Sequence, residues 1–185
     1  MKKLFLLSLL TSILALSNAS MSIDPVFIDS YAKDSRLMNL HQCARLEDIF
    51  TQNYKDICLA PVNQQHQRFI NHVLYTKNNV AILSDAYKNI IGFMTYKVDG
   101  PQFNSMNIEL LAIDKKHQKM GYGSTLLSHA TQCARNLGFK EIDLFALSHT
   151  LGFYHKHGFE PVSHFDYHIE ADNRSVQIYK LRKLV

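Results

Sequence analysis

Hydrophobic and polar positions fall into segments with two different periods. Apolar residues recur at helical spacing in residues 36–50 and 63–76, which predicts two helices in the first part of the chain. Short apolar runs bounded by turn residues predict strands at residues 26–30, 80–83 and 90–98. The chain is therefore expected to begin with a strand and two helices and to continue into a meander of strands.

The same patterns continue in the second half. A long apolar strand starts at Asn107 and leads through a glycine-containing loop into a helix at residues 125–137, with its apolar residues on one face and Gly138 at its end. A buried strand at 142–146, a short helix around Tyr154 and two strands at 159–167 and 175–181 complete the chain. Alternating strands and helices in this order predict an α/β domain.

Length and composition limit the possible architectures. The chain has 185 residues, 46% of them hydrophobic, which is enough for one domain with a core of its own. The formal net charge is +4, but Lys2 and Lys3 lie in a predicted targeting segment, and the remainder is nearly balanced. With no run of basic residues and no recognisable reader motif, the sequence gives no case for nucleic acid binding.

Residues 1–19 have the pattern of a secretory signal peptide. Lys2 and Lys3 precede an apolar run from Leu4 to Leu16, and small residues follow up to Ala19. The run is too short to span a bilayer as a helix, so no membrane span is expected after cleavage. We expect an exported mature domain at residues 20–185. The alternative is a cytoplasmic protein whose translation starts at Met21.

Three cysteines leave two possibilities for the redox state. An exported protein with Cys43, Cys58 and Cys133 could hold one disulfide and one free thiol, and Cys43 with Cys58 is the favoured pair because the two are close in sequence. All three could equally be ordinary buried thiols, because cysteine is often buried without a partner.

The loop between the long strand and its helix has the composition of a phosphate site. It reads Gln118-x-x-Gly121-x-Gly123, with Lys115, Lys116 and Lys119 beside it. Glycines let the backbone turn tightly and bring several N–H groups toward one anion. The unpaired N–H groups and the dipole of the helix N-terminus favour a phosphate at the same place.

Two other phosphate motifs do not fit. A dinucleotide fingerprint requires a third glycine where Leu126 stands, and a P-loop requires a lysine directly after Gly123, where the chain has Ser124. The stretch instead resembles the strand, loop and helix of motif A in the GNAT acetyltransferase superfamily. Residues 144–159, which end in Phe-Tyr-x-x-x-Gly-Phe, resemble a later motif of the same superfamily. The resemblance implies a mixed, mostly antiparallel central sheet of six to seven strands with helices on both faces.

The resemblance also implies a ligand and the residues that bind it. In this superfamily the loop and helix hold the pyrophosphate of coenzyme A, while the backbone of the preceding strand binds the pantetheine arm and the acyl carbonyl. Acetyl-coenzyme A is thus the expected co-substrate. Its expected binding residues are Leu111, Ala112, Ile113, Gln118, Lys119, Met120, Gly121, Tyr122, Gly123 and Ser124.

Two residues are candidates for catalysis. An amine must lose a proton before it can attack, and a free alkyl amine is mostly protonated at neutral pH. Glu109 lies where many members carry an acidic residue facing the acceptor, so it is the candidate base, directly or through water. The alternative is a strand-end glutamate that faces solvent or pairs with a lysine.

Tyr154 matches the tyrosine that lies beside the sulfur of coenzyme A in this superfamily, which makes it the candidate acid for the departing thiolate. The alternative is a half-buried helical tyrosine with its hydroxyl in water. One departure from the family is Leu147, which stands where many members have an asparagine that binds pantetheine.

The ten histidines do not form a metal-binding pattern. His155 and His157 would face apart on a helix, and His164 and His168 would stand too far apart along a strand. No metal is expected. His149 precedes the Tyr154 helix and could line an acceptor cleft.

Together these features predict an acetyl-coenzyme A dependent N-acetyltransferase that moves an acetyl group to a primary amine by direct transfer in a ternary complex. The acceptor would be a small-molecule or peptide amine, and the protein a monomer or homodimer. The alternative is a non-catalytic GNAT-like module that binds acyl-coenzyme A or a partner.

Overall fold

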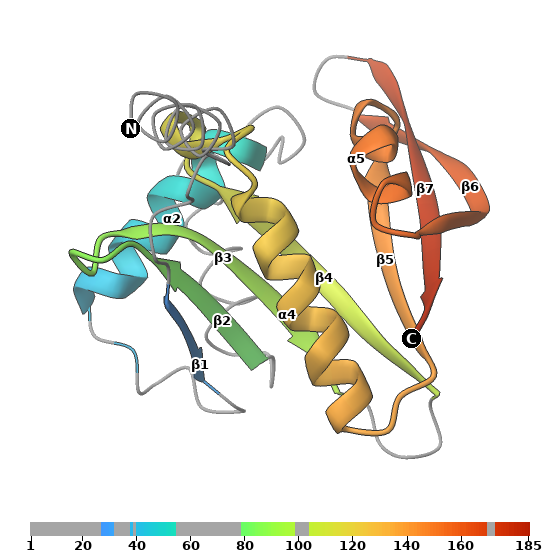
Figure 1. Ribbon diagram of the computed structural model, residues 1–185. Coiled ribbons are helices and arrows are strands. Elements are labelled where there is room, and N and C mark those ends of the chain that lie inside the picture. The colour runs from blue at the N-terminus through green and yellow to red at the C-terminus, as the bar shows by residue number, and fades with distance from the viewer. Residues whose placement is uncertain (1–26, 32–37, 39, 55–78, 99–103, 170–172) are drawn as a thin grey trace, which may run out of the picture.

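The computed structural model describes residues 27–31, 38, 40–54, 79–98, 104–169 and 173–185 (Figure 1). The predicted signal peptide, the predicted helix at 63–76 and Cys58 lie outside these residues, so the first two expectations stay predictions. Cys43 and Cys133 carry free thiols, so for Cys43 the structure has the unpaired alternative and not the favoured disulfide with Cys58. No helix in the described part is long and apolar enough to cross a membrane.

One seven-stranded sheet organises the domain, in the order β1-β2-β3-β4-β5-β7-β6. Its first four strands are antiparallel neighbours. They are β1 (Phe27–Tyr31), β2 (Asn79–Ser84), β3 (Ile90–Lys97) and β4 (Ser105–Ile113). This is the meander that the short apolar runs predicted.

The remaining strands introduce the one parallel pair among the described strands. β5 (Glu141–Leu147) runs parallel to β4, and β7 (Arg174–Leu184) pairs antiparallel with both β5 and β6 (Glu160–Ile169). A mixed, mostly antiparallel sheet of six to seven strands was expected, and the structure confirms it.

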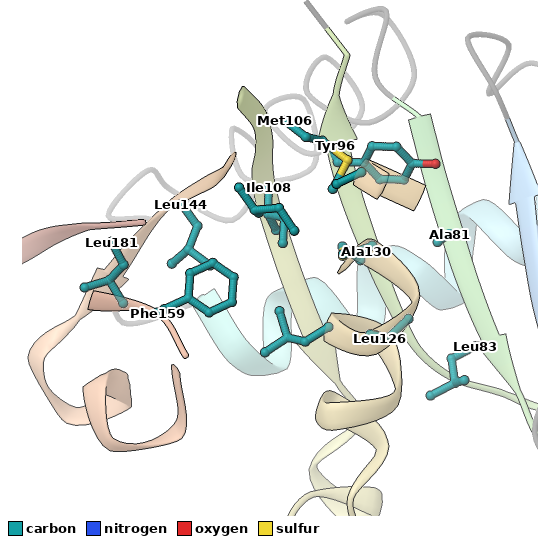
Figure 2. Packing of buried hydrophobic residues seen from close by; sticks show 14 of the residues in the cluster. Ala81, Leu83, Tyr96, Met106, Ile108, Leu126, Ala130, Leu144, Phe159 and Leu181 are labelled. Carbon is teal, nitrogen blue, oxygen red and sulfur yellow. The ribbon is translucent and has the colours of Figure 1, made fainter. Parts of the chain in front are cut away.

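Helices cover both faces of the sheet, as expected. On one face, α2 (Leu40–Tyr54) buries Leu46 and Ile49 against Ile82 and Phe93. On the other, α4 (Tyr122–Asn136) belongs to a larger apolar cluster. Figure 2 shows Leu126 and Ala130 of α4 over the strands of this cluster. Burial of each large apolar side chain contributes about 1.5–3 kcal/mol, so each of the two clusters fixes its helix on the sheet.

Helix boundaries differ from the sequence expectation by about one turn. The helix expected at 36–50 is found at Leu40–Tyr54, and the one expected from Thr125 already starts at Tyr122. Gly121 adopts a positive φ of 88° directly before Tyr122, which ends the loop and lets the helix begin there. Short helical turns η3 (Lys115–His117), η4 (Ser148–Thr150) and α5 (Leu151–His155) complete the connections.

The close approach of β3 and β4 requires a glycine at position 92. A Cβ there would lie 2.5 Å from Cδ1 of Ile113 and 2.9 Å from the backbone oxygen of Ala112. Because the oxygen belongs to a paired strand, Gly92→Ala should lower the free energy of unfolding by about 1–3 kcal/mol in urea titrations. Gly152→Ala is the matched control, since a Cβ at 152 has nothing within 4 Å. Equal stability of the two variants would contradict this account.

Candidate active site

The site begins where β4 and β5 separate. The two strands pair only from Ser105 to Ile108 on β4 and from Glu141 to Leu144 on β5. Beyond Leu144, β5 continues to pair with β7 as far as Leu147. In Figure 1 the two strands diverge toward the end that carries α5. The edge of β4 after Ile108 therefore has no strand partner on the β5 side among the described residues.

A β-bulge at Glu109 coincides with this separation. Tyr96 pairs with Ile108 and Thr95 pairs with Leu110, so Glu109 is an extra residue on β4. A bulge bends its strand and increases the local twist, and bulges are common next to active sites. The bend directs the second half of β4 away from β5.

A cavity of about 250 Å³ occupies the opening. Its lining comes from α2, β4, β5, η4, α5 and β7, and includes Tyr54, Leu111, Phe145, His149, Tyr154 and Ile178. Most of the lining side chains are apolar or aromatic, and the polar groups are a histidine, two phenols, an asparagine and a threonine. Such a mixture is typical of small-molecule sites.

The three strand residues expected to bind a donor differ in their surroundings. Leu111 lines the cavity, and both of its backbone polar groups contact the hydroxyl of Tyr54. Ala112 is buried in the core beneath α2. The carbonyl of Ile113 accepts hydrogen bonds from Asn53 and Gln118. Leu111 is therefore the member of this group that lies at the opening.

The loop and helix start have the geometry expected of an anion cradle. α4 begins without a side-chain cap in the described structure, and its first backbone bond runs from Thr125 N–H to the Gly121 carbonyl. The N–H groups of the first turn thus keep the orientation that suits an anion. Lys115, Lys116 and Lys119 are exposed beside the loop.

Individual loop residues have more specific roles than the sequence indicated. The Nε2 atom of Gln118 donates to Asn53 Oδ1 at 2.9 Å and to the Ile113 carbonyl at 3.1 Å, so Gln118 ties the loop to α2 and β4. Lys119 adopts a positive φ of 64°, and the Met120 side chain is exposed. The Tyr122 side chain is buried in the core, which leaves its backbone for a ligand.

The helix start also packs directly against α5. A Cβ at Gly123 would lie 3.0 Å from Cζ of Phe153, so the glycine makes room for this ring. Ser124 Oγ lies 2.9 Å from Nε2 of His157, whose ring packs against Phe153. The cradle and the helix that carries Tyr154 are therefore held together by direct contact.

Tyr154 lies at the cavity, between the rings of Phe153 and Phe159. Burial, and to a smaller degree the charge of a deprotonated Tyr54, raises the pKa of Tyr154 above that of a free phenol. The hydroxyl therefore stays protonated throughout the neutral range and can act as a hydrogen-bond donor.

Glu109 forms an ion pair with Lys97, with 3.3 Å between Oε1 and Nζ. Glu109 is not one of the described residues that line the cavity. The pairing is the alternative that the sequence left open beside a role as base. The assignment of Glu109 as base stays a prediction.

The histidines divide into different surroundings. His149 lines the cavity, as its position before the Tyr154 helix suggested. His155 lies 3.5 Å from Glu160, and His164 packs against the ring of Tyr179. Within the described ranges, no three His, Cys, Asp or Glu side chains are grouped as metal ligands.

Three residues that contact the cradle or the edge of β4 were not predicted from the sequence. Asp114 accepts a hydrogen bond from the Lys116 N–H and pairs with Arg45 of α2, so it anchors the turn that leads into the cradle. Tyr54 reaches the edge of β4. Arg45 and Tyr54 lie far from the motif in the sequence, and no local pattern connects them to it.

The comparisons with known proteins agree with this geometry. Residues 76–161 match the family model described as acetyltransferase (GNAT) domain. The sequence matches no curated protein.

Solved structures give the fold of similar proteins. One is a proposed phosphinothricin N-acetyltransferase, with 18% sequence identity and a TM-score of 0.67. The alignment covers 87% of this chain and 99% of that protein. GCN5 of Tetrahymena has 16% identity and a TM-score of 0.65, and the alignment covers 86% of this chain and 96% of that protein. The ribosomal-protein-S18-alanine N-acetyltransferase of Escherichia coli has 15% identity and a TM-score of 0.65, and the alignment covers 87% of this chain and 94% of that protein. The expected resemblance to the GNAT superfamily is confirmed.

The Asp114 anchor gives a prediction for stability and its pH dependence. Burial alone would raise the pKa of Asp114, but the bonds from Lys116 N–H and Arg45 outweigh it and lower that pKa. Asp114→Asn should therefore reduce the free energy of unfolding by about 2 kcal/mol at pH 7. The stabilisation is present above the unfolded pKa of about 3.9 and is lost as pH falls toward the folded value, so the difference from wild type should shrink at pH 3.

Asp48→Asn is the matched control in the same urea titrations. Asp48 also pairs with Arg45, but its side chain is 55% exposed, and exposed pairs contribute about 0–1 kcal/mol. An Asp114 variant as stable as the Asp48 variant, or a difference that persists unchanged at pH 3, would refute the anchor.

Proposed function

Because residues 76–161 match the family model described as acetyltransferase (GNAT) domain, we propose that the chain is an acetyl-coenzyme A dependent N-acetyltransferase. It transfers the acetyl group directly to a primary amine in a ternary complex. The observation that carries this proposal is the joining of three features. The edge of β4 at Leu111, which has no strand partner on the β5 side in the described structure, and the half-buried phenol of Tyr154 line one cavity. The third feature, the anion cradle at Gly121, is in direct contact with the helix that carries Tyr154.

The donor would lie along these features in order. The pyrophosphate binds the N–H groups of the first turn of α4, with the exposed lysines nearby. The pantetheine arm extends along the edge of β4, where backbone groups that lack a strand partner on the β5 side can bond its amides. This path brings the thioester to the cavity that Leu111 and Tyr154 line.

The reaction needs a proton acceptor and a proton donor. The neutral amine attacks the thioester carbonyl carbon, and its proton passes to a base, for which Glu109 acting through water is the proposed group. When the tetrahedral intermediate collapses, the carbon–sulfur bond breaks and Tyr154 donates a proton to the departing thiolate. Its raised pKa keeps the phenol in the protonated form that this step requires.

The acceptor is an amine of a small molecule or a peptide. The names of similar structures include both kinds, since one is called a proposed phosphinothricin N-acetyltransferase and another a ribosomal-protein-S18-alanine N-acetyltransferase. The ion pair between Glu109 and Lys97 favours the competing possibility, a module that binds acyl-coenzyme A without turnover.

Donor binding is tested by thermal unfolding with and without acetyl-coenzyme A. At a hundred times its dissociation constant, the ligand should stabilise the fold by about 2.7 kcal/mol and raise the midpoint by roughly 5–10 °C. The pantetheine arm without its phosphates is the control and should give a much smaller shift. Equal shifts, or none with acetyl-coenzyme A, would refute the assignment of the cradle.

Catalysis is tested by Tyr154→Phe, which keeps the ring packing and removes the hydroxyl. Loss of a general acid should lower kcat about 100-fold while the KM for acetyl-coenzyme A changes little. The control is Tyr87→Phe, because Tyr87 is 86% exposed in the turn between β2 and β3. In the wild type, the raised pKa predicts that the rate does not fall through ionisation of Tyr154 below about pH 10. Full activity of Tyr154→Phe would favour another acid, and absence of turnover in the wild type would favour the binding module.

A further inference from the structure

Tyr54 occupies the backbone edge that the proposed donor would use. Its hydroxyl donates to the Leu111 carbonyl at 3.0 Å and lies 3.4 Å from the Leu111 nitrogen, whose N–H points at it. Tyr54 is the last residue of α2 and lies 57 positions from Leu111 in the sequence. The contact thus joins the end of a helix to the open edge of the sheet.

The position of the hydroxyl is fixed by its neighbours. The ring of Tyr54 stacks on the buried ring of Phe50, with 5.0 Å between centroids and 21° between planes. The preceding residue, Asn53, donates to the Ile113 carbonyl at 3.0 Å and accepts from Gln118. The last turn of α2 is therefore bound to β4 at two places, which holds the phenol in place before any ligand arrives.

The two contacts with Leu111 differ in strength. The bond to the carbonyl has ordinary length, but 3.4 Å is longer than the 2.7–3.2 Å typical of an N–H···O bond. The N–H of Leu111 is consequently only weakly satisfied and can donate to an incoming carbonyl oxygen. The phenolic hydrogen can turn to the same oxygen by rotation about the C–O bond.

The family resemblance already implies that the β4 backbone binds the acyl carbonyl. We propose that Tyr54 is a catalytic residue that donates a second hydrogen bond to the acyl carbonyl oxygen, beside the Leu111 N–H. This inference rests on the proposed acetyl transfer. As the amine nitrogen bonds to the carbonyl carbon, the π electrons move to the oxygen, and both donors stabilise the negative charge. When the carbonyl re-forms, the carbon–sulfur bond breaks and the thiolate leaves with a proton from Tyr154.

The arrangement gives the two phenols of the cavity different tasks. Tyr54 and Tyr154 both line it, but only Tyr54 contacts the backbone of Leu111 in the described structure. Fixed donors in a site of low polarity stabilise a developing charge more than water does, because they need no reorganisation during the reaction. Tyr54 donates a hydrogen bond to the carbonyl oxygen, whereas Tyr154 donates a proton to the sulfur.

The test uses a signal that does not depend on the acceptor. Acetyl-coenzyme A labelled with ¹³C at the carbonyl is bound to the full-length protein, and the carbonyl resonance is recorded by NMR. Hydrogen bonds to a carbonyl oxygen polarise it and move the resonance downfield. We expect a downfield shift with the wild type, a clearly smaller shift with Tyr54→Phe, and the wild-type shift with the Tyr87→Phe control.

A second substitution guards against indirect effects on folding. 3-Fluorotyrosine at position 54 keeps the ring and the hydroxyl but is a stronger donor, so it should move the resonance further downfield than the wild type. With an amine acceptor, Tyr54→Phe should lower kcat about 100-fold and leave the KM for acetyl-coenzyme A nearly unchanged. A residue that only tied α2 to β4 would alter KM or the unfolding midpoint instead.

The outcomes separate this inference from the proposed function. Binding of acetyl-coenzyme A by the wild type with the same carbonyl shift in Tyr54→Phe would overturn the role of Tyr54 and leave the acetyltransferase proposal intact. An increase in KM at unchanged kcat would also overturn it. If the wild type did not bind acetyl-coenzyme A, both the proposed acetyl transfer and the role of Tyr54 would be refuted.

Discussion

The bulge at Glu109 is the feature on which the candidate site depends. An extra residue in β4 shifts its pairing with β3 between Thr95 and Tyr96, and the pairing with β5 ends at the adjacent Ile108. Without that interruption the parallel ladder would continue, and the backbone groups of Leu111 would be used within the sheet. At the bulge the edge of β4 changes from paired strand to an edge with no strand partner on the β5 side among the described residues, while the antiparallel pairing with β3 continues.

Three helices meet at this opening from different directions. The last turn of α2 brings Asn53 and Tyr54 to the β4 edge, α4 presents its uncapped first turn, and α5 carries Tyr154. α4 and α5 are in direct contact, since Phe153 packs on Gly123, and His157 just after α5 bonds Ser124. A substitution in the cradle that moves α5 would therefore also move Tyr154. This packing explains why a glycine that the motif relates to phosphate also has a structural role.

Electrostatics at the site divide into a buried and an exposed part. Asp114 and Arg45 form a network beneath the loop, while the lysines that could approach a phosphate stay at the surface. Buried charges are retained where they are bonded on several sides, which Asp114 achieves with a backbone N–H and a guanidinium. The surface lysines can then attract an anion without weakening the core.

The sequence alone determined the order of the described strands and helices and the loop motif, because these depend on local periodicity and on glycines at fixed spacing, and the resemblance to the family pointed to Tyr154. It could place Glu109 on β4 but could not show the ion pair with Lys97, because that pair forms between neighbouring strands. Tyr54, Arg45 and Asp114 meet only after α2 packs on the sheet. Long-range packing decided these contacts, because no short pattern records which distant side chain reaches an open strand edge.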